Sequence, residues 1–215
     1  MKTVYLSETA DPRLKNYIRE CGYDIFNVKA TNLVSGPISS HADIYYCKLG
    51  CGDDAPVFCG EKARLGPVYP SDIIYNAACT GKFFIHDLRY TDSMLMEKAK
   101  AMGMIFINVK QGYSKCSICI VDENSVITSD HGIAKKIREE KGPDCLLIEP
   151  GHIILKGHKY GLIGGSCGLI GNEIVFNGDI SLHPDFKRIS DHIKSRGLSL
   201  KWFPGRELED IGSLL

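Results

Sequence analysis

Two cysteines stand in sequence contexts that could make a thiol reactive. Cys167 follows two glycines and a serine in "GGSCGLIG", and Cys116 directly follows Lys115 in "KCSICIV". A reactive thiol needs a lowered pKa, which a neighbouring cation or a helix N-terminus supplies. We therefore expect Cys116, which also has Lys110 upstream, to titrate lower than Cys167 and to be the better nucleophile. The alternative for both cysteines is a small buried core residue.

A histidine and a carboxylate lie close together in "SSHAD", where His41 and Asp43 are two residues apart. On a strand this spacing places both side chains on the same face. A carboxylate beside a histidine favours the imidazolium form and orients the ring. The pair is therefore a candidate for proton transfer, and the alternative is a polar pair that closes a turn after Pro37.

These residues must be positioned by a repeat that recurs along the chain. Four stretches share one pattern, and they begin at Thr3, Phe83, Ser125 and Glu173. Each opens with a short apolar strand, continues through a capping signal into an amphipathic helix of about three turns, and returns as a second strand. Glycines are expected to end the four helices, at Gly22, Gly103, Gly142 and Gly197.

A third strand with a polar opening follows the second strand in each repeat. The repeats define units at about 3–52, 83–124, 125–172 and 173–215, with a degenerate unit at 53–82 that lacks a convincing helix. Because one unit alone cannot bury its apolar face, the units must close on one another. We therefore expect a single α/β domain, a five-fold pseudosymmetric propeller of strand–helix–strand–strand units.

The polar openings of the third strands should meet around the axis of such a ring. They contain His41 and Asp43, Asp72, Lys115 and Cys116, Ser166 and Cys167, and Glu209 and Asp210. We expect these side chains to line one central cavity. The catalytic candidates are His41, Asp43, Cys116 and Cys167, and the other five residues are candidates for binding a substrate.

A ring of five such units resembles the pentein fold of the guanidino-group-modifying enzymes, and the resemblance covers nearly the whole chain. The chain looks most similar to the small clostridial proteins assigned to that fold, through "SSHAD", "KQGYSKCS" and "NGDISLHPD". The resemblance implies a cysteine thiolate that attacks a guanidinium carbon, a histidine for proton transfer and carboxylates that hold the cation.

Single residues match the motifs of that family. "SHAD" resembles its His-x-Asp motif, which implies a catalytic role for His41 with Asp43 as its partner. "GGSCG" resembles the glycine-rich run before its catalytic cysteine, which makes Cys167 a candidate as well. Glu209 and Asp210 would take the guanidinium-binding role.

Three functions follow from these residues. The first is a thiol-dependent hydrolase or transferase acting on the C–N bond of a guanidino-like or amide substrate. The second is a non-catalytic protein that binds a small ligand or a macromolecule on the same fold. The third is a hard cation held by the oxygens of Asp43, Asp72 and Asp210. This alternative is weaker than the other two, because the same openings also contribute thiol and amine groups, which a hard cation does not prefer.

Composition limits the partners and the compartment. Lys+Arg and Asp+Glu both number 26, and a net charge of zero argues against nucleic acid or an anionic membrane as partner. No apolar run approaches the roughly 20 residues of a membrane span, and the N-terminus lacks a signal-peptide pattern. Nine cysteines, an odd number, indicate reduced thiols in a cytoplasm. Their spacing does not match a structural zinc site, so we expect neither a metal nor another cofactor.

Overall fold

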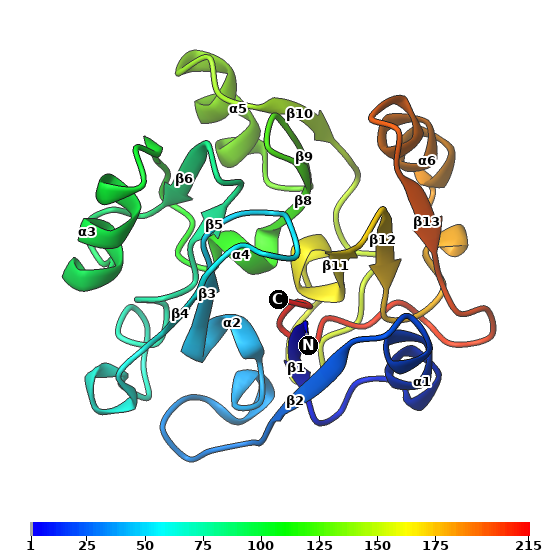
Figure 1. Cartoon of the computed structure of the whole chain (residues 1–215), viewed down its shortest axis with the longest axis horizontal. Coiled ribbons are helices and arrows are strands. Elements are labelled where there is room, and N and C mark those ends of the chain that lie inside the picture. The colour runs from blue at the N-terminus through cyan, green and yellow to red at the C-terminus, as the bar shows by residue number, and fades with distance from the viewer. Residues whose placement is uncertain (1) are drawn as a thin grey trace.

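The computed structural model describes residues 2–215, a mixed α/β chain whose strands form five small sheets within that range. Figure 1 shows the sheets placed around the middle of the molecule, with the four longest helices toward the outside. Within residues 2–215, no helix has both the length and the apolar character that crossing a membrane requires.

The four predicted strand–helix–strand segments are present. They are β1 (Thr3–Ser7), α1 (Pro12–Glu20) and β2 (Asp24–Val28); β6 (Phe83–His86), α3 (Ser93–Ala101) and β7 (Ile105–Asn108); β9 (Ser125–Thr128), α5 (His131–Glu139) and β10 (Asp144–Leu147); and β12 (Glu173–Phe176), α6 (Phe186–Ser195) and β13 (Ser199–Lys201). In each segment the two strands pair in parallel, so the helix is the crossover between them.

Local signals explain where most of these helices begin and end. The side chains of Asp11, Asp92 and Asp130 each accept a hydrogen bond from a backbone N–H of the first helical turn. Three of the four predicted terminal glycines have a positive φ. At the end of α5, however, the residue with positive φ is Lys141 (φ 51) and not Gly142, so that prediction is wrong by one position.

Each long helix packs through one apolar stripe. The buried pairs are Leu14 and Ile18 on α1, Leu95 and Ala99 on α3, Ile133 and Ile137 on α5, and Ile189 and Ile193 on α6. Residues four apart lie on the same face of a helix, and burying one large aliphatic side chain contributes about 1.5–3 kcal/mol. The stripes anchor the helices to the sheets and leave the middle of the molecule free for polar side chains.

The predicted third strands differ from expectation at their polar openings, which form short helical turns. These turns and the strands that follow are α2 (Ala42–Tyr45) and β3 (Tyr46–Lys48), α4 (Ser114–Ser117) and β8 (Ile118–Asp122), and η3 (Ile163–Ser166) and β11 (Cys167–Ile170). His41 and Asp43 are therefore not on a strand. The turn of α2, and not strand alternation, places the two side chains.

The degenerate stretch contains β4 (Val57–Cys59), the 3-10 turn η2 (Lys62–Arg64) and β5 (Ala78–Cys79). Two further 3-10 turns, η1 (Gly36–Ile38) and η4 (Ile180–Leu182), lie in loops. The stretch "LEDIGSLL" was expected to form a strand. It instead makes an isolated bridge at Glu209, and it exchanges two backbone hydrogen bonds of 3.0 Å between Leu215 and Tyr5 of β1.

Successive repeats are joined by antiparallel pairing. Strand β3 pairs with β4, β5 with β6, β8 with β9 and β11 with β12. In the last three cases the strand that precedes a strand–helix–strand segment therefore extends the sheet of that segment. The two bonds between Leu215 and Tyr5 connect the C-terminal segment to β1.

Candidate functional site

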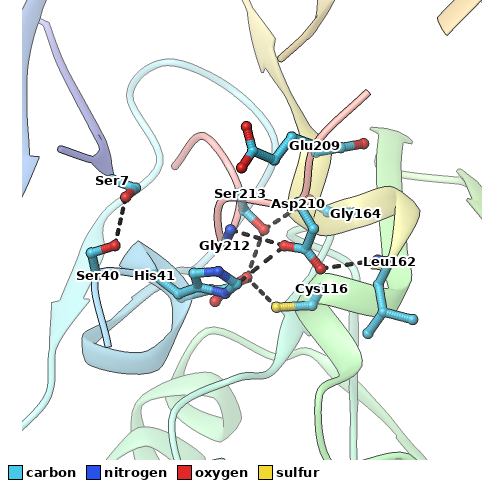
Figure 2. Close-up of polar contacts among 12 residues, drawn as sticks. Ser7, Ser40, His41, Cys116, Leu162, Gly164, Glu209, Asp210, Gly212 and Ser213 are labelled. Carbon is cyan, nitrogen blue, oxygen red and sulfur yellow. Dashed lines mark hydrogen bonds and ion pairs between the residues drawn. The ribbon is translucent and has the colours of Figure 1, made fainter. Parts of the chain in front are cut away.

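A cluster of buried polar side chains occupies the middle of the molecule. His41, Cys116, Asp210 and Ser213 point toward one another in Figure 2. Each is at most 3% exposed, and Asp43, which belongs to the same cluster, is fully buried. They come from the start of α2, from α4 and from the C-terminal segment, so three of the predicted polar openings do converge.

The thiol of Cys116 lies against a carboxylate. Its Sγ donates a hydrogen bond of 2.9 Å to Oδ2 of Asp43. A ring nitrogen of His41, a carboxylate oxygen of Asp43 and this sulfur all lie within 4.8 Å of one another. Thiol, imidazole and carboxylate are the groups required for nucleophilic catalysis with proton transfer.

Asn76 holds the start of α4 in place, and the sequence analysis did not single it out. Its Oδ1 accepts hydrogen bonds from the backbone N–H groups of Lys115 at 2.9 Å and Cys116 at 3.3 Å. Its Nδ2 donates to the carbonyl oxygen of Asp43 at 3.2 Å. The side chain therefore fixes the thiol relative to the carboxylate. The only sequence signal was its place in "PSDIIYNAACTG", where Asp72 was chosen instead.

Ser213 is a second site residue that the sequence analysis missed. Its hydroxyl lies 2.7 Å from Oδ2 of Asp43 and 2.8 Å from the carbonyl oxygen of Gly164. One hydroxyl proton can serve only one of these acceptors at a time. Ser213 also has a positive φ of 71, a conformation that costs an ordinary residue energy and that is concentrated at functional sites.

The ammonium of Lys115 bonds to groups other than the thiol. It is 7% exposed and donates to Oγ of Ser213 at 2.9 Å and to the carbonyl oxygen of Gly164 at 3.3 Å. Burial, followed by the charges of Asp43 and Asp210, raises the pKa of Cys116 well above its usual value. The expectation that Lys115 and Lys110 lower the pKa of this thiol is therefore wrong.

Asp210 is the second carboxylate of the cluster. Its oxygens accept backbone hydrogen bonds from Leu162 at 2.9 Å and Gly212 at 3.0 Å, and Oδ1 lies 3.8 Å from Nδ1 of His41. Burial raises the pKa of Asp210 to about 6. Burial also lowers the pKa of His41, against the opposing charge of Asp43. At neutral pH the imidazole is therefore neutral and the Asp210 carboxylate is largely ionised.

The two glycines of "GGSCG" permit close approach in the cluster. A Cβ on Gly164 would lie 2.2 Å from the carbonyl oxygens of Lys115 and Ile118, and a Cβ on Gly165 would lie 1.9 Å from Oδ1 of Asp210. Any side chain at these positions would displace the Lys115 backbone or the carboxylate. The glycine-rich run is therefore explained by packing around Asp210 and α4.

Cys167 lies in different surroundings from Cys116. It is 1% exposed, belongs to an apolar cluster that includes Ile163 and Phe176, and donates to the carbonyl oxygen of Ile163 at 3.2 Å. Burial and a hydrogen bond with Cys119 raise its pKa well above the usual value. These surroundings are those of a core thiol.

The other predicted binding residues are held by local partners. Asp72 is buried and accepts a hydrogen bond of 2.7 Å from the Tyr113 hydroxyl. The Ser166 hydroxyl donates to the carbonyl oxygen of Ile163 at 2.8 Å. Glu209 is half-buried and forms an ion pair with Arg206. The structure therefore does not bring these three side chains into the hydrogen-bond network around Cys116 and Asp43.

The segment 149–162 covers the cluster from one side. The backbone N–H of Asp210 donates to the carbonyl oxygen of Ile154 at 2.8 Å, and Leu162 donates to the Asp210 carboxylate. A cavity of about 350 Å³ lies along this segment, lined by residues that include His158, Asp179 and Glu207. Because Cys116 is only 3% exposed, a ligand reaches the thiol only when the surrounding segments move.

Comparison with known proteins shows a family and a distant structural similarity. No curated protein matches the sequence. An agmatine deiminase from C. jejuni is a distant structural neighbour, with 13% sequence identity and a TM-score of 0.33 over 94% of this chain and 70% of that chain. A model described as a family of unknown function (DUF6873) matches residues 53–215, which include Cys116 and Asp210. The chain belongs to that family.

Proposed function

We propose that this protein is a thiol-dependent hydrolase or transferase that acts on the C–N bond of a guanidino-like or amidine cation. Cys116 is the nucleophile and His41 transfers protons. The observation that carries the proposal is the cluster itself: Cys116 Sγ lies 2.9 Å from Asp43 Oδ2, and a ring nitrogen of His41 lies within 4.8 Å of both groups.

The proposal includes a five-fold pseudosymmetric, pentein-like ring built of the five units 3–52, 53–82, 83–124, 125–172 and 173–215. Five small sheets within residues 2–215 support it, as does the pairing of third strands with the sheet of the following unit. The hydrogen bonds between Leu215 and Tyr5 also support a closed ring, because they join the last unit to the first.

The charge of the cluster favours a cationic substrate. Asp43 and Asp210 are buried carboxylates, and Lys115 is the buried ammonium that offsets one of them. A guanidinium or amidinium group is planar and presents several N–H donors, which suits recognition by carboxylates. Asp43 and Asp210 would therefore bind the cation beside the sulfur, and a neutral analogue would bind more weakly.

A bound cation would also activate the thiol. In the free protein, burial and two carboxylates raise the pKa of Cys116, so the sulfur is protonated at neutral pH. A cation placed between these carboxylates offsets their charge and favours the thiolate. Burial keeps the pKa of His41 low in the free site, so its imidazole is neutral there. A neutral imidazole has a free nitrogen lone pair that can accept the thiol proton.

The reaction then proceeds in two steps, formation of a covalent intermediate on Cys116 and its hydrolysis. The sulfur of Cys116 bonds to the central carbon of the cation, and the C–N bond breaks as the His41 imidazolium protonates the leaving amine. Water then bonds to the same carbon while His41 takes one of its protons. The C–S bond breaks, the thiol regains its proton and a urea or amide product leaves. In a transferase, an amine would replace water in the second step.

A binding protein without turnover is the second candidate. The low exposure of Cys116 and its raised pKa favour this alternative, because both make the free thiol unreactive. The two candidates share the cationic ligand, and they differ in whether Cys116 is needed after the ligand has bound.

A screen of guanidino and amidine compounds tests the proposal. Ligand binding is measured by thermal shift, and turnover is measured as release of ammonia or amine. We expect Cys116→Ala to abolish turnover while cationic ligands still raise its melting temperature, and Cys167→Ala to retain turnover. Full turnover in Cys116→Ala would contradict the enzyme, and binding without turnover in the wild-type protein would select the binding protein.

A further inference from the structure

We propose that His41, Asp43 and Cys116 also bind a transition-metal dication of the zinc class, with Asp210 as the fourth ligand. This site goes beyond the proposed function and does not depend on turnover. His41, Asp43 and Cys116 offer three donor atoms within 4.8 Å of one another, and every proposed donor side chain, including that of Asp210, is at least nine-tenths buried.

The spacing of the donor atoms fits a tetrahedral ion. Zinc bonds of about 2.3 Å to sulfur and about 2.0–2.1 Å to nitrogen and oxygen place neighbouring ligand atoms about 3.3–3.6 Å apart. Cys116 Sγ and Asp43 Oδ2 are 2.9 Å apart, and His41 Nδ1 and Asp210 Oδ1 are 3.8 Å apart. The three principal donors lie within 4.8 Å of one another. Asp210 lies outside that group of three, so its carboxylate would have to move toward the ion to complete the tetrahedron.

Two buried atoms in the cluster have unused hydrogen-bonding capacity. Nδ1 of His41 and Oδ1 of Asp43 have no hydrogen-bond partner within residues 2–215. Leaving such a buried group unsatisfied costs free energy, so native proteins rarely leave one without a reason. Both atoms are good metal donors, and both belong to side chains that surround the same sulfur. A cation between them would satisfy both at once.

The charges of the cluster suit a dication. Metal binding requires a neutral imidazole at His41 and a deprotonated thiol at Cys116. The charge of a dication stabilises the thiolate. With Cys116, Asp43 and Asp210 all ionised, the dication and the Lys115 ammonium together balance the charge of the cluster.

The thiolate decides which metals bind. Sulfur and imidazole donors suit Zn²⁺, Co²⁺ and similar ions, whereas Mg²⁺ and Ca²⁺ prefer oxygen donors. The groups around the donors are already held: Ser213 lies in hydrogen-bond contact with Asp43, and Nδ2 of Asn76 lies 3.5 Å from the sulfur. Such outer contacts orient the ligands of metal sites.

The metal and a cationic ligand would compete for the same carboxylates. Binding of one would exclude the other, and a bound ion would block the sulfur of Cys116. The two proposals can nevertheless fail separately, because metal binding is read from spectra and needs no substrate.

Cobalt(II) titration of the metal-free protein tests the site. We expect one equivalent to give the intense visible bands of tetrahedral cobalt and a near-ultraviolet thiolate-to-cobalt band, with release of one proton. Cys116→Ala should lose the thiolate band, and His41→Ala should weaken binding by about tenfold or more. Cys51→Ala and Cys59→Ala are the controls, since these thiols lie outside the cluster, and both should keep the full spectrum.

Several results would overturn the site. They are a thiolate band that survives in Cys116→Ala, the weak spectrum of octahedral cobalt, or no spectral change at all in the wild-type protein. Circular dichroism of each variant shows whether it is folded. If Cys116→Ala does not fold, His41→Ala and competition by Zn²⁺ against the cobalt bands decide the question, since unchanged cobalt affinity in His41→Ala would also overturn it.

Discussion

The thiol of Cys116 donates its hydrogen bond to Asp43, 73 residues earlier in the chain, at 2.9 Å. The partner of this sulfur is thus an anion, whereas a reactive thiol usually has a cation beside it. The relationship makes the free thiol a poor nucleophile and makes the cluster a good site for a cation.

Removing the charge of Asp43 should lower the pKa of Cys116. In Asp43→Asn the side chain keeps its shape but loses the negative charge beside the sulfur, and this charge is the largest cause of the raised pKa after burial. The thiol pKa is measured by NMR titration of the ¹³Cβ signal of Cys116, assigned by comparison with Cys116→Ser. Asp72→Asn is the matched control, because Asp72 is buried but bonds to Tyr113. An equal shift in both variants, or none in Asp43→Asn, would contradict the assigned role.

Asp210 should make the protein less stable as pH rises from about 4 to about 6. Burial raises the pKa of Asp210 from 3.8 to about 6, so the folded state binds its proton more tightly than the unfolded state. The stabilisation from this proton is full below pH 3.8 and is lost as pH rises through about 6. The loss amounts to about 3 kcal/mol, since one pKa unit corresponds to about 1.4 kcal/mol.

The comparison of wild-type protein with Asp210→Asn isolates this effect. Unfolding free energies are measured by urea titration between pH 3 and pH 7, and the difference between the two proteins should change by about 3 kcal/mol. Asp11→Asn is a control of opposite sign: hydrogen bonds to Arg13 lower the pKa of Asp11 against burial, so its stabilisation is lost as pH falls. A flat difference for Asp210→Asn would contradict the raised pKa.

Gly212→Ala should lower the stability of the protein more than Gly103→Ala. The two glycines have nearly equal positive φ angles of 74 and 72. A Cβ on Gly212 would lie 2.1 Å from Cβ of His41, whereas a Cβ on Gly103 meets nothing within 4 Å. Both alanines pay about 1 kcal/mol for the backbone conformation, and overpacking adds roughly 1–3 kcal/mol at Gly212. Melting temperatures of the two variants decide, and equal losses would contradict the close approach.

Ser213 allows its backbone and its hydroxyl to be tested separately. Ser213→Ala and Ser213→Gly both remove the hydroxyl that accepts from Lys115, but only glycine relieves the positive φ of 71. We expect Ser213→Gly to be the more stable of the two by about 1 kcal/mol. Chemical denaturation measures the difference. A glycine variant that is less stable than the alanine variant would mean that the backbone at Ser213 is not strained.

Local sequence signals were enough to predict the strand–helix–strand segments. Capping residues such as Asp92, terminal glycines such as Gly103 and apolar residues four apart all act within one helix, so they can be read without the fold. The short turns α2 and α4 were missed because four residues are too few to show a helical period. The sequence therefore indicated strands where the chain forms one helical turn before each strand.

The repeat assigns His41, Asp43, Cys116 and Asp210 to the polar openings of the first, third and fifth units, and on that ground we expect these side chains to lie near one another. The individual hydrogen bonds between these segments were not predictable. The hydroxyl of Ser213 meets Asp43 across 170 residues, and neither residue type signals this contact. The expected effect of Lys115 on the pKa of Cys116 was wrong for the same reason. The acceptors of its ammonium, Gly164 and Ser213, lie far from it in the sequence.

The proposed function requires that the buried carboxylates Asp43 and Asp210 select a cation and bind it beside Cys116. The most direct test compares alkylation by chloroacetamidine, a planar cation, with alkylation by chloroacetamide, its neutral analogue of nearly equal size. Mass spectrometry of peptides gives the rate at each cysteine, with exposed Cys21 and Cys59 as internal references. At each cysteine, the rate with chloroacetamidine is divided by the rate with chloroacetamide. We predict that this ratio is at least about tenfold higher at Cys116 than at the two reference cysteines. Asp43→Asn should remove this preference. Equal preference at all cysteines, or no reaction at Cys116 until the protein unfolds, would contradict the account.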